Sequence, residues 1–242
     1  MADVKVAMEN ANEAWRWNTV RTKEPGTVKW IEAQVQSGDV FYDIGANVGV
    51  YTVMAAQLVG PEGHVYAFEP HVANARSLLH NLSLNEWGKR VQVITSALHD
   101  STGYFLFNYR KMKAGTSGHQ LGHTQGELGD TFEPVAVEIK HSTTVDDLLD
   151  KVVIRPPNVV KIDVDGNELR ILQGMVNLLT HRPPRTLQVE LHPQDEVQVI
   201  QCLQRHGYTL VERHYTEMGQ HAMDAGVPAE KIAHNGVFIV IG

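Results

Sequence analysis

The sequence predicts an α/β fold in which a seven-stranded, mostly parallel sheet carries helices on both faces. Short apolar runs of strand length recur along the 242 residues, and stretches with the apolar spacing of helices lie between them. A glycine-containing turn joins the first such run to the helix that follows it. Strands that alternate with helices are typical of parallel sheets buried between two helical layers. Because seven strands use the whole length, we expect one domain over residues 1–242.

The chain is expected to begin with a helical lead-in, residues 1–38, that could cover the ligand site. Within it, Trp15–Gln36 has helical character, and Thr27 can cap a helix with Ile31 and Val35 on its inner face. The expected strands follow in the order Val40–Ile44, His64–Phe68, Val91–Thr95, Val159–Ile162, Thr186–Leu191, Tyr208–Val211 and Val237–Ile241.

Two helices between these strands have clear patterns. Val72–Leu84 carries apolar residues three and four apart, which lays one stripe on a sheet, and Gly88 is expected to close it as a C-terminal cap. Val197–Leu203 repeats the pattern and is expected to stop at Gly207.

The middle of the chain departs from the alternation. Tyr104–Asn108 and Val135–Lys140 are expected to be extended, and residues 109–133 form the long loop between them. A connection of this length is usually functional or disordered. We expect this variable loop, together with Tyr215–Ala233, to build the acceptor side of the site.

Composition excludes several classes of function. With 28 acidic against 21 basic residues the net charge is -7, which disfavours nucleic acid as a partner. Cys202 is the only cysteine, so no intrachain disulfide forms and a reducing cytoplasm is favoured. The first residues lack a basic stretch followed by an apolar one, and no apolar run reaches the roughly 18 residues of a membrane span. Neither secretion nor membrane insertion is expected.

The segment Asp43–Tyr51 is the turn after the first strand. Its spacing is G-x-N-x-G, whereas a dinucleotide fingerprint has a middle glycine that clears space for pyrophosphate. Asn47 at that place, and the negative charge of Asp43 before the turn, favour a smaller nucleoside ligand. Glu69 ends the second strand about 20 residues later, where an acidic residue accepts hydrogen bonds from both ribose hydroxyls. A nucleoside-binding site is therefore favoured over the alternative that Asp43 only caps a helix and Glu69 is an ordinary surface residue.

Three polar residues, Asp163, Glu190 and His192, come at the ends of later strands. They fall on the same carboxyl edge of the sheet as Glu69, where ligands of open α/β sheets bind. His192 is the best candidate for a general base because its pKa lies near the working pH. An equally supported interpretation is that His192 is a structural residue at the strand end whose hydrogen bonds are made within the fold.

Asp163 also begins a run of polar residues that includes Asp165 and Asn167. Gly166 follows Asp163 too closely for a calcium-binding loop of the EF-hand type, so no metal is expected. Asn167 is expected to cap the helix that starts near Glu168.

In this order, these motifs resemble the FkbM family of S-adenosylmethionine-dependent methyltransferases. The resembling segments are Phe41–Thr52, Tyr66–Pro70, Ser142–Leu149, Val159–Leu172 and Gln188–Pro193. The likeness spans residues 24–193, and its most family-specific element is K-I-D-V-[DE]-G-x-E, where this chain has Asp165 and the family more often has glutamate. The resemblance implies a Rossmann-like class I methyltransferase fold with S-adenosylmethionine as cofactor.

The resemblance also implies roles for individual residues. Those that would surround the cofactor, from its methionine end to its adenine, are Asp43, Gly45, Asn47, Gly49, Glu69, Pro70, Ser96 and Ala97. Glu24 would close over the cofactor, and Asp163 would lie between cofactor and acceptor. Glu190 and His192 would face the acceptor.

The implied reaction is O-methylation of a small hydroxylated metabolite, such as a sugar or a natural-product intermediate. The resemblance, and not any spacing, supplies oxygen as the acceptor atom. Three alternatives stay open: an RNA methyltransferase, disfavoured by the acidic charge; a nucleoside-binding domain without turnover; and a nicotinamide oxidoreductase, disfavoured by the missing central glycine. No oligomeric state is predicted.

Overall fold

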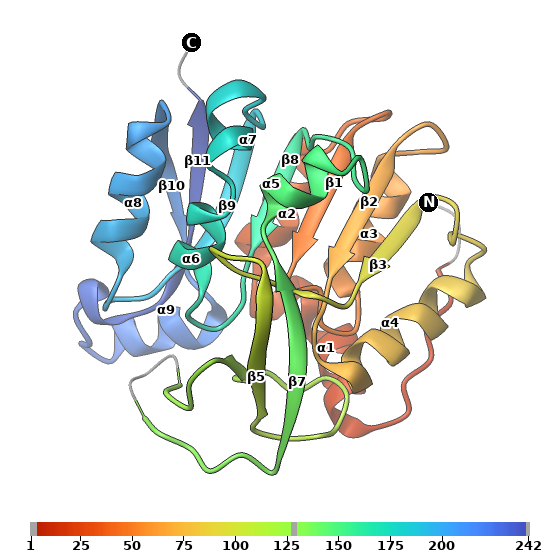
Figure 1. Cartoon of the computed structure of the whole chain (residues 1–242). Helices are drawn as coiled ribbons and strands as arrows, with labels where there is room; N and C mark the ends of the chain where they lie inside the picture. Colours follow the sequence, from red (N-terminus) through yellow and green to blue (C-terminus); the bar gives the residue numbers. More distant parts are fainter. Residues whose placement is uncertain (1–3, 127–129, 241–242) are drawn as a thin grey trace.

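The structure is a computed structural model that describes residues 4–126 and 130–240. Its main sheet has seven strands in the order β10-β11-β9-β8-β1-β2-β3 (Figure 1). The strands are β1 Val40–Ile44, β2 His64–Phe68, β3 Val91–Ile94, β8 Val159–Ile162, β9 Thr186–Leu191, β10 Tyr208–His214 and β11 His234–Val240. Strands β3, β2, β1, β8 and β9 are parallel, whereas β11 pairs antiparallel with both β9 and β10. The predicted seven-stranded, mostly parallel sheet is confirmed, and the predicted end of the last strand, Ile241, lies outside the described residues.

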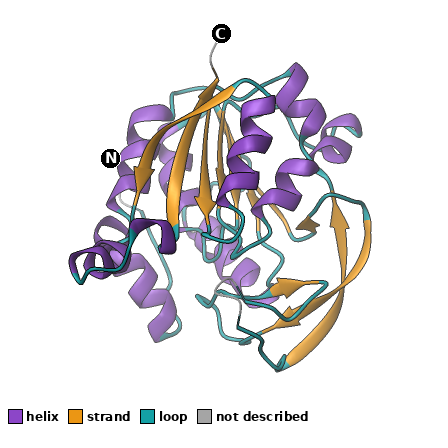
Figure 2. Ribbon diagram, turned by 90° about the vertical axis from the view of Figure 1, so that its left-hand side faces the viewer, coloured by secondary structure: helices purple, strands orange, loops and turns teal. Residues whose placement is uncertain are grey.

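Helices cover both faces of this sheet (Figure 2). They are α1 Ala11–Lys23, α2 Pro25–Gln34, α3 Val50–Leu58, α4 Val72–Leu84, α5 Val145–Asp150, α6 Glu168–Gln173, α7 Val176–His181, α8 Glu196–Arg205 and α9 Glu217–Asp224, followed by the 3₁₀ turn Ala229–Lys231. Apolar side chains of α2, α3 and α4 pack on one face, and those of α5, α6, α7 and α8 on the other. None of the helices in the described ranges is both long and apolar enough to cross a bilayer.

The lead-in differs from the single capped helix expected there. Two helices meet at Glu24, because Pro25 lacks an N–H and occupies the first position of α2. Thr27 therefore lies inside α2 and does not cap it. Asn10 caps the earlier helix instead, in a reciprocal arrangement with Glu13.

The two predicted helix ends have different outcomes. α8 is followed by Gly207 at φ +81°, which confirms the expected stop. α4 ends earlier than a cap at Gly88 requires, so that prediction is wrong. Its cap residue is Asn85, and the next residue, Glu86, takes the left-handed conformation (φ 57°) that was expected of a glycine.

A second, smaller sheet lies below the carboxyl ends of the parallel strands in Figure 1 and was not predicted as a sheet. Its strands, in the order β4-β7-β5-β6, are β4 Ala97–Leu98, β7 Ala136–Thr143, β5 Gly103–Tyr109 and β6 Gln120–Leu121. The two expected extended pieces are β5 and β7, which pair antiparallel. This pairing brings the loop between β5 and β7 back toward the main sheet. Residues 127–129 of that loop are not among the described residues.

Candidate active site

Two glycines allow the turn after β1 to approach its neighbours closely. Gly45 has φ +82°, and an added Cβ would lie 1.7 Å from the backbone oxygen of Asp163. Gly49 has φ +89° at the start of α3, where a Cβ would lie 2.3 Å from the side chain of Leu78. Both positions therefore require glycine, and the turn comes into contact with the end of β8 and with α4.

The N–H groups of this turn are all used within the protein. Those of Gly45 and Ala46 donate to the carbonyl of Phe68, and that of Asn47 donates to Glu69 at 2.7 Å. The next two donate to the Asn47 side chain and to the Ala46 carbonyl. Unlike a phosphate-binding loop, the turn offers no amide to an anion, in agreement with the prediction that pyrophosphate is disfavoured.

Glu69 is held at the end of β2 by two backbone N–H groups. Its carboxylate oxygens accept from Asn47 at 2.7 Å and from His71 at 2.8 Å. Burial raises the pKa of Glu69 to about 7, although both N–H donors oppose the shift. Only 5% of the residue is exposed, yet it borders a cavity at this edge of the sheet, so its free lone pairs face a ligand space.

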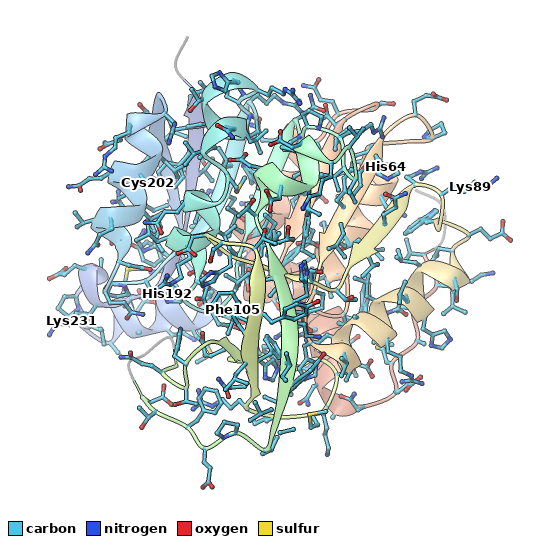
Figure 3. The ribbon with its side chains drawn as sticks, viewed as in Figure 1. His64, Lys89, Phe105, His192, Cys202 and Lys231 are labelled. Atoms are coloured by element: carbon cyan, nitrogen blue, oxygen red, sulfur yellow. The ribbon has the colours of Figure 1, made fainter. Side chains whose placement is uncertain are left out.

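That cavity has a volume of about 540 Å³ and lies at the carboxyl edge of the parallel strands. The expected site residues that line it are Glu24, Gly45, Asn47, Glu69, Pro70, Ser96, Ala97, Asp163 and Glu190. Three expected residues do not line it. Asp43 is fully buried, and Gly49 packs on α4. His192, which is labelled in Figure 3, is fully buried directly after β9 and contacts Glu190.

Asp43 faces a buried lysine that opens the family-specific K-I-D-V element but was given no role in the sequence analysis. Lys161 comes from β8, directly beside Asp43 in the strand register, and its Nζ lies 3.8 Å from Asp43 and 3.1 Å from Asp163. Burial by itself would lower the pKa of Lys161, but Asp163 and Asp43 raise it above its ordinary value. Burial opposes ionisation of Asp163 as well, yet Lys161 lowers the pKa of Asp163 to about 2. Both groups are therefore charged at neutral pH.

Three carboxylates converge on the cavity wall. Oxygens of Asp163, Asp165 and Glu190 lie within 4.8 Å of one another. Burial first, and then the charge of Asp163, raise the pKa of Glu190 well above its ordinary value. The His192 ring contacts the Glu190 carboxylate at 3.1 Å and Glu168 at 4.0 Å. The three carboxylates can accept protons or hydroxyl hydrogen bonds. Two groups of the described residues have the geometry to ligate a cation, these carboxylates and the set of Glu168, Glu190 and His192.

His192 was expected to face the acceptor directly, and the structure corrects this. The residue follows the last position of β9, where the alternation of side chains ends. The residue is fully buried and does not line the cavity, whereas Glu190 does. The His192 ring instead contacts the Glu190 carboxylate at 3.1 Å.

A strap formed by Gly115–Gln120 closes one side of the cavity. The carbonyl of Thr116 accepts from the Asn47 side chain at 2.9 Å, and the N–H of Gly115 donates to Asn74 at 2.8 Å. On the other side, the N–H of Gly118 donates to the Asp165 carboxylate at 2.7 Å. The strap therefore connects the glycine turn to the three carboxylates through Asp165. These segments are far apart in the sequence, so no local motif indicates the connection.

The expected cap of α6 is also corrected by the strap. Asn167 makes no capping bond, because its amide donates to Gln120 at 2.9 Å. The carboxylate of Glu168, the first residue of α6, instead accepts from the N–H groups of Val164 and Gly166 and so fixes the turn that precedes the helix.

The remaining walls come from both ends of the chain. Arg16, Val20 and Lys23 line the cavity from α1, and Tyr51 lines it from α3. A mostly apolar wall follows from residues 216–233, with Thr216, Met218, Gly219, Ala222, Val227, Lys231, Ile232 and Ala233. In Figure 1, α1 and α9 both lie below the carboxyl edge of the main sheet.

The cavity suits the nucleoside methyl donor implied by the sequence. Its volume is within the usual range for small-molecule sites, about 300–1,000 Å³. Glu69 can accept from ribose hydroxyls, while Pro70, Ala97 and Leu98 provide apolar surface for an adenine. Glu24 and Asp163 add carboxylates to the lining, and carboxylates attract cationic groups such as an ammonium or a sulfonium.

Known proteins share both the sequence pattern and the fold. A hexuronic acid methyltransferase of Haloferax volcanii is 26% identical over 175 residues, which are 72% of this chain and 65% of that protein. The 31-O-demethyl-FK506 methyltransferase of Streptomyces tacrolimicus is 27% identical over 205 residues, 74% of this chain and 75% of that protein. The solved structure of Aeropyrum pernix fibrillarin, with natively bound S-adenosyl-L-methionine, matches at 11% identity with a TM-score of 0.52 over 92% of this chain and 76% of that one. That likeness shows a shared fold.

The family evidence covers most of the chain. The methyltransferase FkbM domain matches residues 43–210, which begin at the buried aspartate of β1 and end in β10. The segments that carried the resemblance in the sequence, from the glycine turn to the end of β9, fall almost entirely within that match. The chain therefore belongs to the FkbM methyltransferase family, and its methyl donor is S-adenosylmethionine.

Proposed function

We propose that the protein transfers a methyl group from S-adenosylmethionine to a hydroxyl oxygen of a small polyhydroxylated metabolite, such as a sugar or a natural-product intermediate. The observation that carries this proposal is the group of three carboxylates, Asp163, Asp165 and Glu190, on the wall of the donor cavity. Carboxylates accept hydrogen bonds from vicinal hydroxyls and can remove a hydroxyl proton. The two relatives are named for small-molecule acceptors, which supports the same class.

Within this proposal Glu190 is the general base. S-adenosylmethionine supplies the methyl group and a neutral thioether leaving group, so the acceptor proton is what the protein must remove. Glu190 lines the cavity, and its raised pKa makes it a stronger base than an ordinary carboxylate. Asp163 stays ionised beside Lys161 and orients the acceptor hydroxyl by accepting its hydrogen bond. His192 acts through Glu190 as a positioning residue, since it does not reach the cavity.

The shape of the acceptor side supports a molecule with both polar and apolar parts. The carboxylates face the inner end, whereas Met218, Ala222 and Val227 give the outer wall an apolar surface. Aligning the acceptor oxygen with the methyl carbon and sulfur is the larger part of catalysis, because positioning alone can accelerate displacement greatly.

The proposal is tested with isotopically labelled methyl donor and a panel of acceptors. Simple glycosides, uronic acids, amines and total RNA are incubated with the protein, and the product is identified by ¹³C NMR. An O-methyl resonance from a hydroxylated acceptor is expected. Methylated RNA or an N-methyl product would overturn the assignment, and donor binding without turnover on any acceptor would favour a nucleoside-binding domain.

Replacing Glu69 with alanine should weaken donor binding before it affects any other step. We expect the dissociation constant of S-adenosylhomocysteine to rise about 100-fold, because two hydrogen bonds to a charged group are lost. Binding to the native protein should weaken about tenfold between pH 8 and pH 6, since only the ionised carboxylate accepts both hydroxyls and its pKa is about 7. Isothermal titration calorimetry measures both effects.

The matched control is Glu62→Ala, which removes an exposed carboxylate from the turn before β2. It should leave the affinity and its pH dependence unchanged. Equal affinities for the native protein and Glu69→Ala would remove Glu69 from the ribose site.

A further inference from the structure

We infer that the two N-terminal helices bind the amino-acid end of the methyl donor, with Arg16 on its carboxylate and Glu24 on its ammonium group. Both residues precede the region matched by the family, which begins at residue 43. Both line the donor cavity, one from the middle of α1 and the other from the corner between α1 and α2. The amino-acid end of S-adenosylmethionine is a zwitterion, and these two side chains carry the opposite pair of charges.

The terminal guanidinium nitrogens of Arg16 are available to bind a ligand. Its Nε donates to the carbonyl of Gly115 at 2.7 Å, and no carboxylate of the described residues lies within ion-pair distance of its guanidinium. The neighbouring cations of the same helix are different, because Arg21 pairs with Glu32 at 3.0 Å and Lys23 pairs with Glu24 at 2.6 Å. The charge of Arg16 acts on Asp163 and Asp165, whose pKa values it lowers, but it forms no direct ion pair with them. A guanidinium that lines a ligand cavity without a direct ion pair points to an anionic ligand.

The contact with Gly115 also fixes where the guanidinium lies. The next residue of the strap, Thr116, accepts from the Asn47 side chain at 2.9 Å. Arg16 is therefore held by the strap next to the residue that contacts the glycine turn, and it lines the donor cavity. A planar guanidinium held through Nε keeps its two terminal nitrogens available for a bidentate bond to a carboxylate.

Glu24 lines the same cavity and is held in place by two partners. One oxygen pairs with Lys23, and the other accepts from the Tyr51 hydroxyl at 3.0 Å. Only 5% of the residue is exposed, and Pro25 starts α2 immediately after it, so the corner is rigid. A carboxylate has about four acceptor sites, so Glu24 retains sites for an ammonium group.

Two other uses of Arg16 predict different results. If Arg16 only tethers the strap, its loss should weaken every ligand that the strap encloses. If it binds an anionic acceptor, its loss should raise the acceptor KM and leave donor affinity alone. A donor analogue without the carboxylate separates these cases.

The experiment is a calorimetric comparison of S-adenosylhomocysteine with its decarboxylated analogue, S-adenosyl-3-thiopropylamine, which keeps the amine. For Arg16→Gln we expect the dissociation constant of S-adenosylhomocysteine to rise about 10–100-fold, while that of the analogue changes less than about twofold. Glu24→Gln should weaken both ligands equally, because both carry the amine. The readout is binding, so it does not depend on knowing the acceptor.

The control is Arg21→Gln, which removes an exposed, ion-paired arginine from the same helix and should leave both affinities unchanged. Equal losses for the two ligands in Arg16→Gln, or unchanged binding of S-adenosylhomocysteine, would overturn the assignment of the carboxylate to Arg16. Neither result would bear on oxygen methylation itself, since the acceptor panel is independent of it.

Discussion

Glu190→Gln should lower kcat by about 10²–10⁴-fold and leave the affinity for S-adenosylhomocysteine nearly unchanged. This is the usual effect of losing a general acid–base group, and the amide keeps the size and one acceptor of the native side chain. The loss falls on kcat because proton removal occurs only during methyl transfer. Single-turnover kinetics with the acceptor found in the panel, together with calorimetry, separate the two quantities. A variant with native kcat would exclude Glu190 as the base.

The same assignment predicts a pH profile for the positioning residue. Activity of the native protein should fall as the pH drops through the pKa of Glu190, because the base must be ionised. Since the hydrogen bond from His192 lowers that pKa, His192→Ala should move the acid limb of kcat to higher pH, and turnover should approach the native value at alkaline pH. A loss that is equal at every pH would instead mean that His192 supports the fold only.

Lys161→Met should lower the free energy of unfolding by about 3–5 kcal/mol. The substitution leaves two carboxylates, Asp43 and Asp163, without the cation that lies between them, and Asp43 is fully buried. Its remaining partner is the Thr52 hydroxyl at 2.5 Å, which cannot neutralise a charge. For a domain of this size the midpoint of thermal unfolding should fall by about 10 °C. Urea and thermal denaturation measure both values.

The pH dependence of this loss has a definite sign. Because the pKa of Lys161 is raised, Lys161 stabilises the folded state fully at any pH below the ordinary lysine pKa. Because the pKa of Asp163 is lowered, Asp163 stabilises the folded state fully at any pH above the ordinary aspartate pKa. The stabilisation that the native ion pair gives to the folded state is therefore constant from pH 5 to 8. The deficit of Lys161→Met should shrink toward pH 5, because protons can neutralise the unpaired carboxylates.

Two further variants make the Lys161 prediction specific. Adding Asp43→Asn to Lys161→Met should recover part of the lost stability by removing one of the buried charges. Lys151→Met removes an exposed lysine 3.9 Å from Asp147 and should change stability by less than about 0.5 kcal/mol. A loss for Lys161→Met as small as that of this control would show that the buried carboxylates do not need the cation.

The parts of the fold that sequence predicted are those governed by short-range patterns. The seven strands of the main sheet are each a contiguous apolar run, and Glu69 reaches the cavity because it ends such a run on a parallel sheet. The same argument brought Asp163 and Glu190 together from strands that are adjacent in space. The position of each residue at the end of a strand was thus sufficient to predict that Asp163 and Glu190 lie near each other.

What sequence missed depends on contacts between distant segments. The strap is placed by side chains of Asn47, Asn74 and Asp165, and nothing in residues 115–120 indicates those partners. Lys161 was passed over because a lysine inside an apolar run has no local sign of its ion pairs. His192 was given too direct a role, since spacing within a strand cannot say how a side chain turns once the strand has ended.

The strap has a consequence for the order of events during turnover. It is bonded to Asn47 and Asn74 above the donor and to Asp165 beside the acceptor, so lifting it uncovers both compartments in one movement. Spent donor and methylated product would then escape through a common gate.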